Sequence, residues 1–206
     1  MKVLVIGASG GVGLAAVQAL RAEGHEATAF VRDASRLPEG LGAAVVQGDV
    51  MDAGAVLAAI PGHDAVMVAL GMPRGRPTAE DVCSTGTAHV VAGMQAAGVR
   101  RLLVVTTLGL GDSKAKAPLL FRAVMATILK KQIADKERQE AVVRASGLDW
   151  TLVRPVGLSA KPATGDWLAD VSKVRAMQVS RADVAGAMVA MAARGQHVGE
   201  AVIVSG

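Results

Sequence analysis

A cluster of glycines near the start of the chain has the spacing of a loop that binds a phosphate-bearing cofactor. The segment GASGGVG follows the apolar run 2–6 directly and leads into a helical pattern. In that context the backbone N–H groups and the helix dipole face a dinucleotide pyrophosphate, although many glycine turns are only structural. We expect Gly7 to allow the tight turn and Gly13 to let helix and strand pack. The N–H groups expected to face the anion belong to Ser9, Gly10, Gly11 and Val12.

The residues after the next apolar run indicate which dinucleotide is bound. The run 27–31 is followed at once by Arg32, and Arg36 comes four residues later. Two guanidinium groups beside the ribose 2′ position would pair with the extra phosphate of NADP, whereas NAD-binding chains place a carboxylate there. Asp33 could supply that carboxylate, and both arginines could simply be solvated. Because Arg32 occupies the end of the run, the sequence favours NADP.

Thr107 and Lys136 are the candidate catalytic residues. Thr107 ends the run VVTT and is placed to hydrogen-bond the nicotinamide carboxamide or the acceptor, unless its hydroxyl is satisfied by backbone. Lys136 could hold the nicotinamide ribose, although a single charge on a polar helix such as KKQIADKERQE is more often solvated. Arg74 and Arg76 could contact a flavin phosphate, although a solvated loop is the more common outcome. The candidates for an apolar acceptor wall, or alternatively for the core face of a helix, are Leu119, Leu120, Phe121 and Met125.

Alternating elements must bring these residues together. Apolar runs of the kind found in buried parallel strands alternate with helical patterns, including long ones over 118–146 and 181–193. This alternation predicts right-handed βαβ units in a single α/β domain, 1–206, with a doubly wound parallel Rossmann sheet in a three-layer α/β/α arrangement. The predicted strands cover residues 2–6, 27–31, 43–47, 64–70, 101–106, 149–154 and 201–204.

The segment at about 156–175 has no clear period, and in a sheet of this type such a loop usually covers the ligand crevice. We therefore expect it to cover the substrate.

Composition narrows the function classes. The 206 residues include one cysteine, Cys83, which excludes an internal disulfide and fits a reducing cytoplasm. The four histidines are scattered, so no metal site is expected. The N-terminus does not have the pattern of a signal peptide, and the longest nearly uncharged stretch, 117–129, is interrupted by Arg122 and is too short to span a bilayer.

The net charge of +4 does not indicate nucleic-acid binding. The basic residues are in pairs and singles, and aromatic residues make up only 2% of the chain, too few for base stacking. A basic surface that suits anionic small molecules is the preferred interpretation, and a monomer is expected.

The order of motifs resembles a known family. GASGGVG, VRDASRLP, GDV, DAVMVALG, VVTTLG and SGLDWTLVRP follow one another as in atypical short-chain dehydrogenases with NAD(P)-binding NmrA-like domains. Within that family the chain is most similar to the flavin reductases that also reduce biliverdin-IXβ. The resemblance implies 2′-phosphate contacts at Arg32 and Arg36 and adenine contacts at Asp49 and Val50. It also implies further cofactor contacts at Ala69, Leu70, Gly71, Thr106, Thr107, Pro155, Val156, Gly157 and Leu158.

The chain departs from the wider family at the proton donor. That family uses a tyrosine acid four residues before a lysine; here the lysine position is Lys136, the tyrosine position is Gln132, and the chain has no tyrosine. Glutamine does not protonate an alkoxide as a phenol does. The flavin reductase-like group has a histidine near the substrate where Gly157 stands here.

These features favour an NADPH-dependent oxidoreductase that transfers hydride to a planar conjugated acceptor, such as a flavin or quinone. Such an acceptor spreads the charge and can take its proton from water, so orientation supplies most of the acceleration. Two alternatives are an NADP-binding sensor without turnover and a relative of sugar-nucleotide epimerases.

Overall fold

Strands from both halves of the chain form one central sheet in a computed structural model, which describes residues 1–71, 81–116 and 130–206. The eight strands lie in the order β3-β2-β1-β4-β5-β6-β10-β8. All neighbours pair in parallel except β8, which is antiparallel to β10. The predicted Rossmann-type α/β fold is confirmed. The strands are β1 (Lys2–Ile6), β2 (Glu26–Val31), β3 (Ala44–Gln47), β4 (Ala65–Val68), β5 (Arg101–Val105), β6 (Asp149–Pro155), β8 (Leu168–Asp170) and β10 (Glu200–Ser205).

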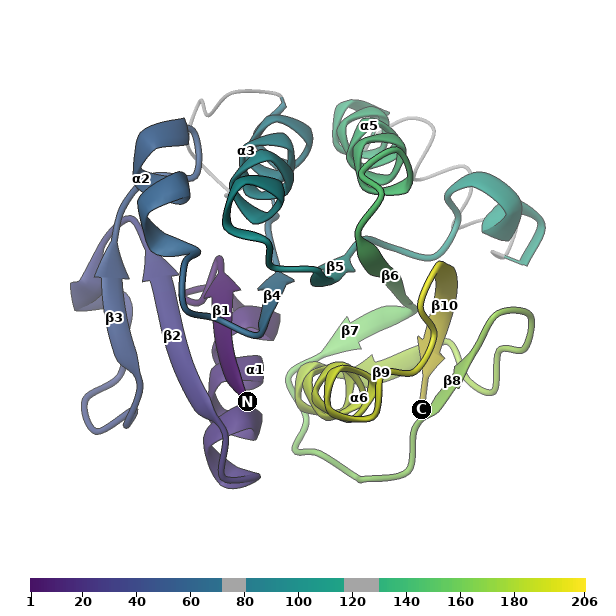
Figure 1. Cartoon of the computed structure of the whole chain (residues 1–206). Coiled ribbons are helices and arrows are strands. Elements are labelled where there is room, and N and C mark those ends of the chain that lie inside the picture. Colours follow the sequence, from purple (N-terminus) through teal and green to yellow (C-terminus); the bar gives the residue numbers. More distant parts are fainter. Residues whose placement is uncertain (72–80, 117–129) are drawn as a thin grey trace.

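Helices cover both faces of this sheet (Figure 1). Helices α1 (Gly11–Ala22) and α6 (Arg181–Arg194) pack against each other on one face. On the other face α2 (Ala53–Ala59), α3 (Val82–Ala97) and α5 (Lys130–Arg144) stand in a row. Two short 3₁₀ turns, η1 (Ala34–Arg36) and η2 (Gly111–Lys116), follow β2 and β5.

Alternation along the strands builds a core on each face. Val3 and Val5 of β1 are fully buried in the cluster that contains α1 and α6. Leu4 and Ile6 point the other way, into the cluster beneath α2 and α3. Apolar burial on both faces is why the central strands are continuous apolar runs.

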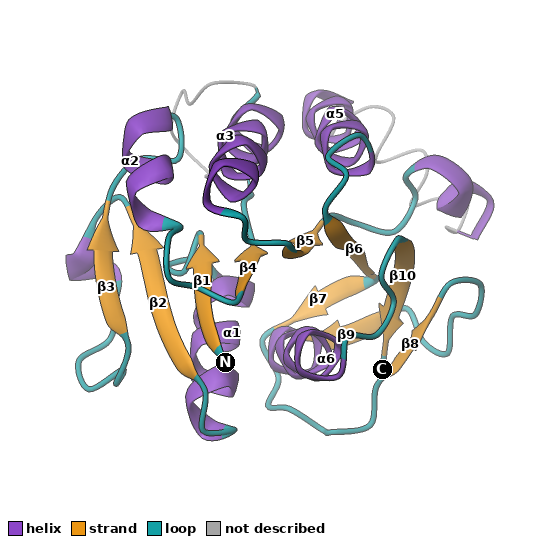
Figure 2. Ribbon diagram, viewed as in Figure 1, coloured by secondary structure: helices purple, strands orange, loops and turns teal. Residues whose placement is uncertain are grey.

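Three details differ from the sequence-based expectation. The run 43–47 does not form a buried strand, because β3 lies at the edge of the sheet and its Val45 is 47% exposed. The segment 156–175 is not a simple loop, since it contains β8 and also β7 (Gly157–Ser159), which pairs with β9 (Gln178–Ser180) in a small second sheet beside α6 (Figure 2). Of the helical pattern predicted over 118–146, the structure describes α5, and the residues before it lie outside the described part.

A buried carboxylate anchors this segment to α6. Asp183, 3% exposed, accepts hydrogen bonds from the backbone N–H groups of Thr164 and Gly165 and from the Ser180 hydroxyl. The Ser180 Oγ in turn caps α6 by accepting from the Asp183 N–H at 2.9 Å. The start of α6 is thereby fixed beside the ligand crevice.

Candidate cofactor site and active site

A cavity of about 440 Å³ lies at the carboxyl ends of β1, β2, β4 and β5, where ligands of doubly wound sheets bind. Most of the predicted site residues contribute to its wall. Those that do are Gly7, Ser9, Gly10, Gly11, Val12, Arg32, Arg36, Asp49, Val50, Ala69, Leu70, Gly71, Thr106, Lys136 and Leu158.

The glycine loop has the close backbone approach that a pyrophosphate site requires. Gly7 has φ 82°, and a Cβ there would meet the carbonyl oxygen of Ala69 at 2.8 Å, so only glycine fits. Gly10 precedes α1 without any side-chain cap, and the first turn of α1 has no acidic residue. The N–H groups of that turn are left to face an anion. A Cβ at Gly13 would lie 2.3 Å from the Gly7 oxygen, which matches the packing role expected for Gly13.

The end of β2 presents two arginines to the cavity. The side chains of Arg32 and Arg36 line it and make no hydrogen bond or ion pair to another described residue. Asp33, the rival carboxylate, does not contribute to the wall and instead accepts from the Ser35 N–H at 3.1 Å and its hydroxyl at 2.7 Å. This hydrogen bonding caps η1, the short turn that contains Arg36.

The neighbouring wall is formed by Phe30, Gly48, Asp49 and Val50. Gly48 lies against the Phe30 ring, since a Cβ there would be 2.7 Å from the ring edge. Asp49 accepts from the Met51 N–H at 3.0 Å, and the Val50 carbonyl contacts His89 Nδ1 at 2.9 Å. These bonds hold the residues to which the resemblance assigned adenine contacts.

Lys136 is not the solvated side chain that its polar helix suggests. Its Nζ donates to the Leu70 oxygen at 2.8 Å, the Val105 oxygen at 2.9 Å and Gln139 Oε1 at 2.9 Å. Burial lowers the pKa of Lys136, while Cys83 and Asp135 act to raise it. An ammonium group has three N–H donors, so two of those of Lys136 join the chain just after β4 to the end of β5, and the third is used on Gln139 of the same helix.

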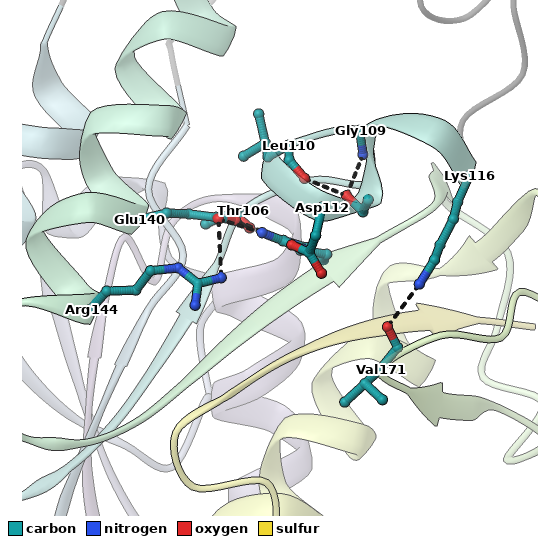
Figure 3. Close-up of polar contacts among 10 residues, drawn as sticks. Thr106, Gly109, Leu110, Asp112, Lys116, Glu140, Arg144 and Val171 are labelled. Carbon is teal, nitrogen blue, oxygen red and sulfur yellow. Dashed lines mark hydrogen bonds and ion pairs between the residues drawn. The ribbon is translucent and has the colours of Figure 1, made fainter.

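The hydroxyl proton of Thr106 is also used in a hydrogen bond within the protein. Its hydroxyl donates to Glu140 Oε1 at 2.8 Å, and Figure 3 shows Glu140 of α5 directed toward it. Arg154, 1% exposed, donates to both oxygens of Glu140, at 2.9 and 2.6 Å, and to Asp112 at 2.7 Å. Toward the cavity, the Thr106 hydroxyl therefore offers lone pairs only.

The rest of the polar face of α5 packs against α3. The Asp135 carboxylate accepts from the N–H groups of Cys83 and Ser84 and so caps the start of α3 from a different helix. Gln139 donates to the Thr87 hydroxyl at 2.8 Å. Burial raises the pKa of the Cys83 thiol to about 11, so this thiol is not a nucleophile at neutral pH.

Five predicted site residues lie outside the cavity wall. Gly13 packs under the loop, and Gly157 donates to the Met177 oxygen at 3.1 Å in the small sheet. Thr107 donates to the Leu108 oxygen at 3.2 Å, the backbone-satisfied alternative for this hydroxyl. Pro155 and Val156 are buried, and each is tied by backbone hydrogen bonds.

Gln132, at the position of the family tyrosine, has a buried Oε1 without a hydrogen-bond partner among the described residues. The candidates Arg74, Arg76, Leu119, Leu120, Phe121 and Met125 lie outside the described residues.

The cavity wall also includes residues that sequence reasoning missed, chiefly Arg181 at the start of α6. A cation at a helix N-terminus is unfavourable for the helix itself, so the position of Arg181 was the sequence signal that could have indicated a binding role. The other missed residues are Ile6, Phe30, Val31, Gly48, Val82 and Val105.

Within the described ranges, no helix is long and apolar enough to cross a membrane. The same ranges contain no group of three or more His, Cys, Asp or Glu residues that could hold a metal ion.

Comparison with known families agrees with this geometry. A family model described as "NAD(P)H-binding" matches residues 7–194. The chain belongs to this family. The predicted resemblance to NAD(P)-binding atypical short-chain dehydrogenases is thereby confirmed, and the cofactor of the family is a nicotinamide dinucleotide.

Individual relatives of the family differ in their named activities. A 3-diazoavenalumate denitrifying reductase from Streptomyces sp is 44% identical over 50% of this chain, which spans 36% of that protein. A protein from Bacillus subtilis named as an uncharacterized sugar epimerase is 29% identical over 92% of this chain and 87% of its own length. The crystal structure of ChuY, an anaerobillin reductase from Escherichia coli O157:H7, superposes with a TM-score of 0.83 at 25% identity, covering 100% of this chain and 97% of ChuY.

Proposed function

We propose that this protein is an NADPH-dependent reductase that transfers hydride to a planar conjugated acceptor, a flavin or a quinone, without a side-chain general acid. The cofactor would be held by the glycine loop at its pyrophosphate and by Arg32 and Arg36 at its 2′-phosphate. NADPH, when bound, supplies the hydride. The residues of the chain bind and orient both partners.

One observation carries the proposal: the described polar side chains at the β5 end of the cavity have their donor hydrogens engaged in hydrogen bonds within the protein. Lys136 uses its N–H groups on Leu70, Val105 and Gln139, and the Thr106 hydroxyl donates to Glu140. The chain contains no tyrosine. Reduction of a ketone needs an acid at the developing alkoxide, whereas a conjugated acceptor delocalises its charge and is protonated by water.

The preference for NADPH is supported by the β2 end. Arg32 and Arg36 face the cavity without a partner among the described residues, while the Asp33 carboxylate is used in capping η1. An unpaired guanidinium suits a phosphate dianion, with which it forms paired, charge-assisted hydrogen bonds.

The acceptor would lie beside Leu158, which extends from β7 into the cavity and is 39% exposed. Gly157, next to it, lies close to the Met177 oxygen, so the small β7–β9 sheet fixes the height of Leu158 above the cavity. An apolar contact of this kind favours an acceptor with an apolar surface.

The experiment is NADPH oxidation measured by absorbance, with FMN, riboflavin and a quinone offered in turn and with NADPH binding measured in parallel. Turnover with at least one acceptor supports the reductase. Tight NADPH binding with no turnover indicates a sensor instead, an alternative that the same committed donors allow. The Bacillus subtilis relative supports the epimerase alternative, but the missing tyrosine opposes it. Interconversion of a sugar nucleotide without net NADPH oxidation would establish that alternative.

A further inference from the structure

We propose that Arg181 is a third cationic contact to the cofactor and binds its pyrophosphate above the glycine loop. This inference rests on the proposed function for the identity of the ligand. It adds a residue from α6, which neither the glycine motif nor the arginines after β2 indicate.

The Arg181 side chain lies directly on the glycine loop. A Cβ at Gly11 would come within 2.5 Å of Arg181 Cδ and 2.7 Å of its Nε, so the stem of the arginine occupies the space that a side chain at Gly11 would need. Both residues line the cofactor cavity. Gly11 is thus required for the approach of Arg181 as well as for the approach of a phosphate.

The charge of Arg181 has no counterpart within the described part of the chain. It makes no hydrogen bond or ion pair there, and it lies between the N-termini of α1 and α6, both positive ends of helix dipoles. The nearest acidic residue on its own helix, Asp183, is saturated by Thr164, Gly165 and Ser180. An anion between the two helix ends and the guanidinium would remove this imbalance.

The base of Arg181 is held rigidly. It directly follows Ser180, whose hydroxyl caps α6, and β9, which pairs with β7. A cation that is fixed before the ligand arrives loses little conformational freedom on binding, which favours affinity.

The three arginines divide the ligand between them. Arg32 and Arg36 lie at the β2 end of the cavity and serve the 2′-phosphate, which only NADP carries. Arg181 lies at the α1 end and serves the pyrophosphate, which NADP and NAD share. Loss of Arg181 should therefore weaken both dinucleotides by the same factor.

Calorimetric titration of the whole chain tests this division with two partial ligands. ADP-ribose has the pyrophosphate but no 2′-phosphate, and 2′-AMP has the 2′-phosphate but no pyrophosphate. We expect Arg181→Gln to raise the Kd of NADPH, NADH and ADP-ribose about tenfold to a hundredfold, the scale of a charged hydrogen bond, and to leave 2′-AMP unchanged. Arg32→Gln should instead weaken 2′-AMP and NADPH and leave ADP-ribose and NADH nearly unchanged. The Arg194→Gln variant, at an exposed position on the last turn of α6, should change none of them.

A second variant tests the contact without removing the charge. Gly11→Ala should displace the Arg181 side chain and weaken NADPH binding, but should cost much less when it is added to Arg181→Ala, because alanine lacks the Cδ and Nε atoms that a Cβ at Gly11 would meet. Equal losses in the two backgrounds would contradict the contact.

The remaining outcomes separate the two proposals. If Arg181→Gln binds ADP-ribose as the wild type does, or loses affinity only for 2′-AMP and NADPH, the proposed role of Arg181 is overturned. The proposed reductase function is not affected by that result. Wild-type protein that binds NADPH but reduces no acceptor overturns the reductase and leaves the Arg181 test intact. Wild-type protein that binds neither dinucleotide overturns both.

Discussion

The two ends of the cofactor cavity use charged side chains in opposite ways. At the phosphate end, Arg32, Arg36 and Arg181 face the cavity without a partner in the described part of the chain. At the end formed by β5 and α5, Lys136 and Thr106 are bonded to backbone or to other side chains. If the proposed function holds, affinity and chemistry have separate sources: the arginines without a described partner would recognise the cofactor, and the hydrogen-bonded polar groups would hold the surface on which the acceptor lies.

The committed end, which is the end of the cavity formed by β5 and α5 where the polar groups are bonded within the protein, should give the largest effect when it is disrupted. The quantity affected is the free energy of unfolding. Glu140→Gln leaves the Arg154 guanidinium, which is 1% exposed, without its buried countercharge. We expect a loss of about 3–5 kcal/mol in the free energy of unfolding, measured by chemical denaturation, and little change in NADPH affinity for the folded fraction.

Glu137→Gln on the same helix is the matched control. Glu137 pairs with Lys114 at 2.7 Å, but both side chains are largely exposed, so the expected cost is below about 1 kcal/mol. Equal costs for the two variants would show that the buried pair does not hold this end together.

The anchor of the segment 156–175 gives the next largest effect, with a defined pH dependence. Burial acts to raise the pKa of Asp183, but hydrogen bonds from Ser180, Gly165 and Thr164 outweigh it and hold that pKa below its ordinary value. The stabilisation is therefore complete above the unfolded pKa of about 3.9 and is lost as pH falls through the folded pKa. Asp183→Asn should cost about 2 kcal/mol at neutral pH.

Denaturation of both proteins across the acid range checks the sign. The gap between wild type and Asp183→Asn should narrow as pH falls below about 4. A gap that stays constant with pH would mean that the carboxylate charge contributes nothing to the anchor.

The open end is the phosphate end of the cavity, with Arg32, Arg36 and Arg181. Substitutions there should change the affinity for the dinucleotide without changing the free energy of unfolding. Arg32→Gln should weaken NADPH at least tenfold, about 1.5–3 kcal/mol, and leave NADH nearly unchanged, because only NADPH carries the 2′-phosphate. Arg21→Gln, an exposed arginine on α1 that bonds to the His25 oxygen, is the control in the same titration. Equal affinity of the wild type for the two dinucleotides would refute the NADP assignment.

The open end was largely predictable from the sequence and the committed end was not. Glycines and arginines at strand ends act through local geometry, so GASGGVG and Arg32 mark their own positions. Arg181 is distant in sequence, and only the fold brings it onto Gly11. The β7 and β9 strands have three residues each, too few to show a period.

Helix α5 shows why the committed end was misread. Its polar sequence predicts a solvated helix, yet Asp135, Gln139 and Glu140 are buried against α3 and β6. Gln139 and Glu140 follow Asp135 by four and five residues, which places all three on one face of the helix. A polar face can be buried only when other parts of the chain supply hydrogen-bonding or charged partners for it. The available clue was Arg154, a charge inside an apolar strand, which requires a buried counterion.

The smallest expected effect is also the most direct test of acid-free reduction. Gln132 stands where the family has its tyrosine, so Gln132→Ala should change kcat/KM for flavin or quinone reduction by less than about tenfold, roughly 1.4 kcal/mol of barrier. Thr107→Val, which removes a hydroxyl bonded to the Leu108 oxygen, is measured beside it. A loss of about 10²–10⁴-fold in Gln132→Ala, the contribution of a true general acid, would contradict a solvent proton source.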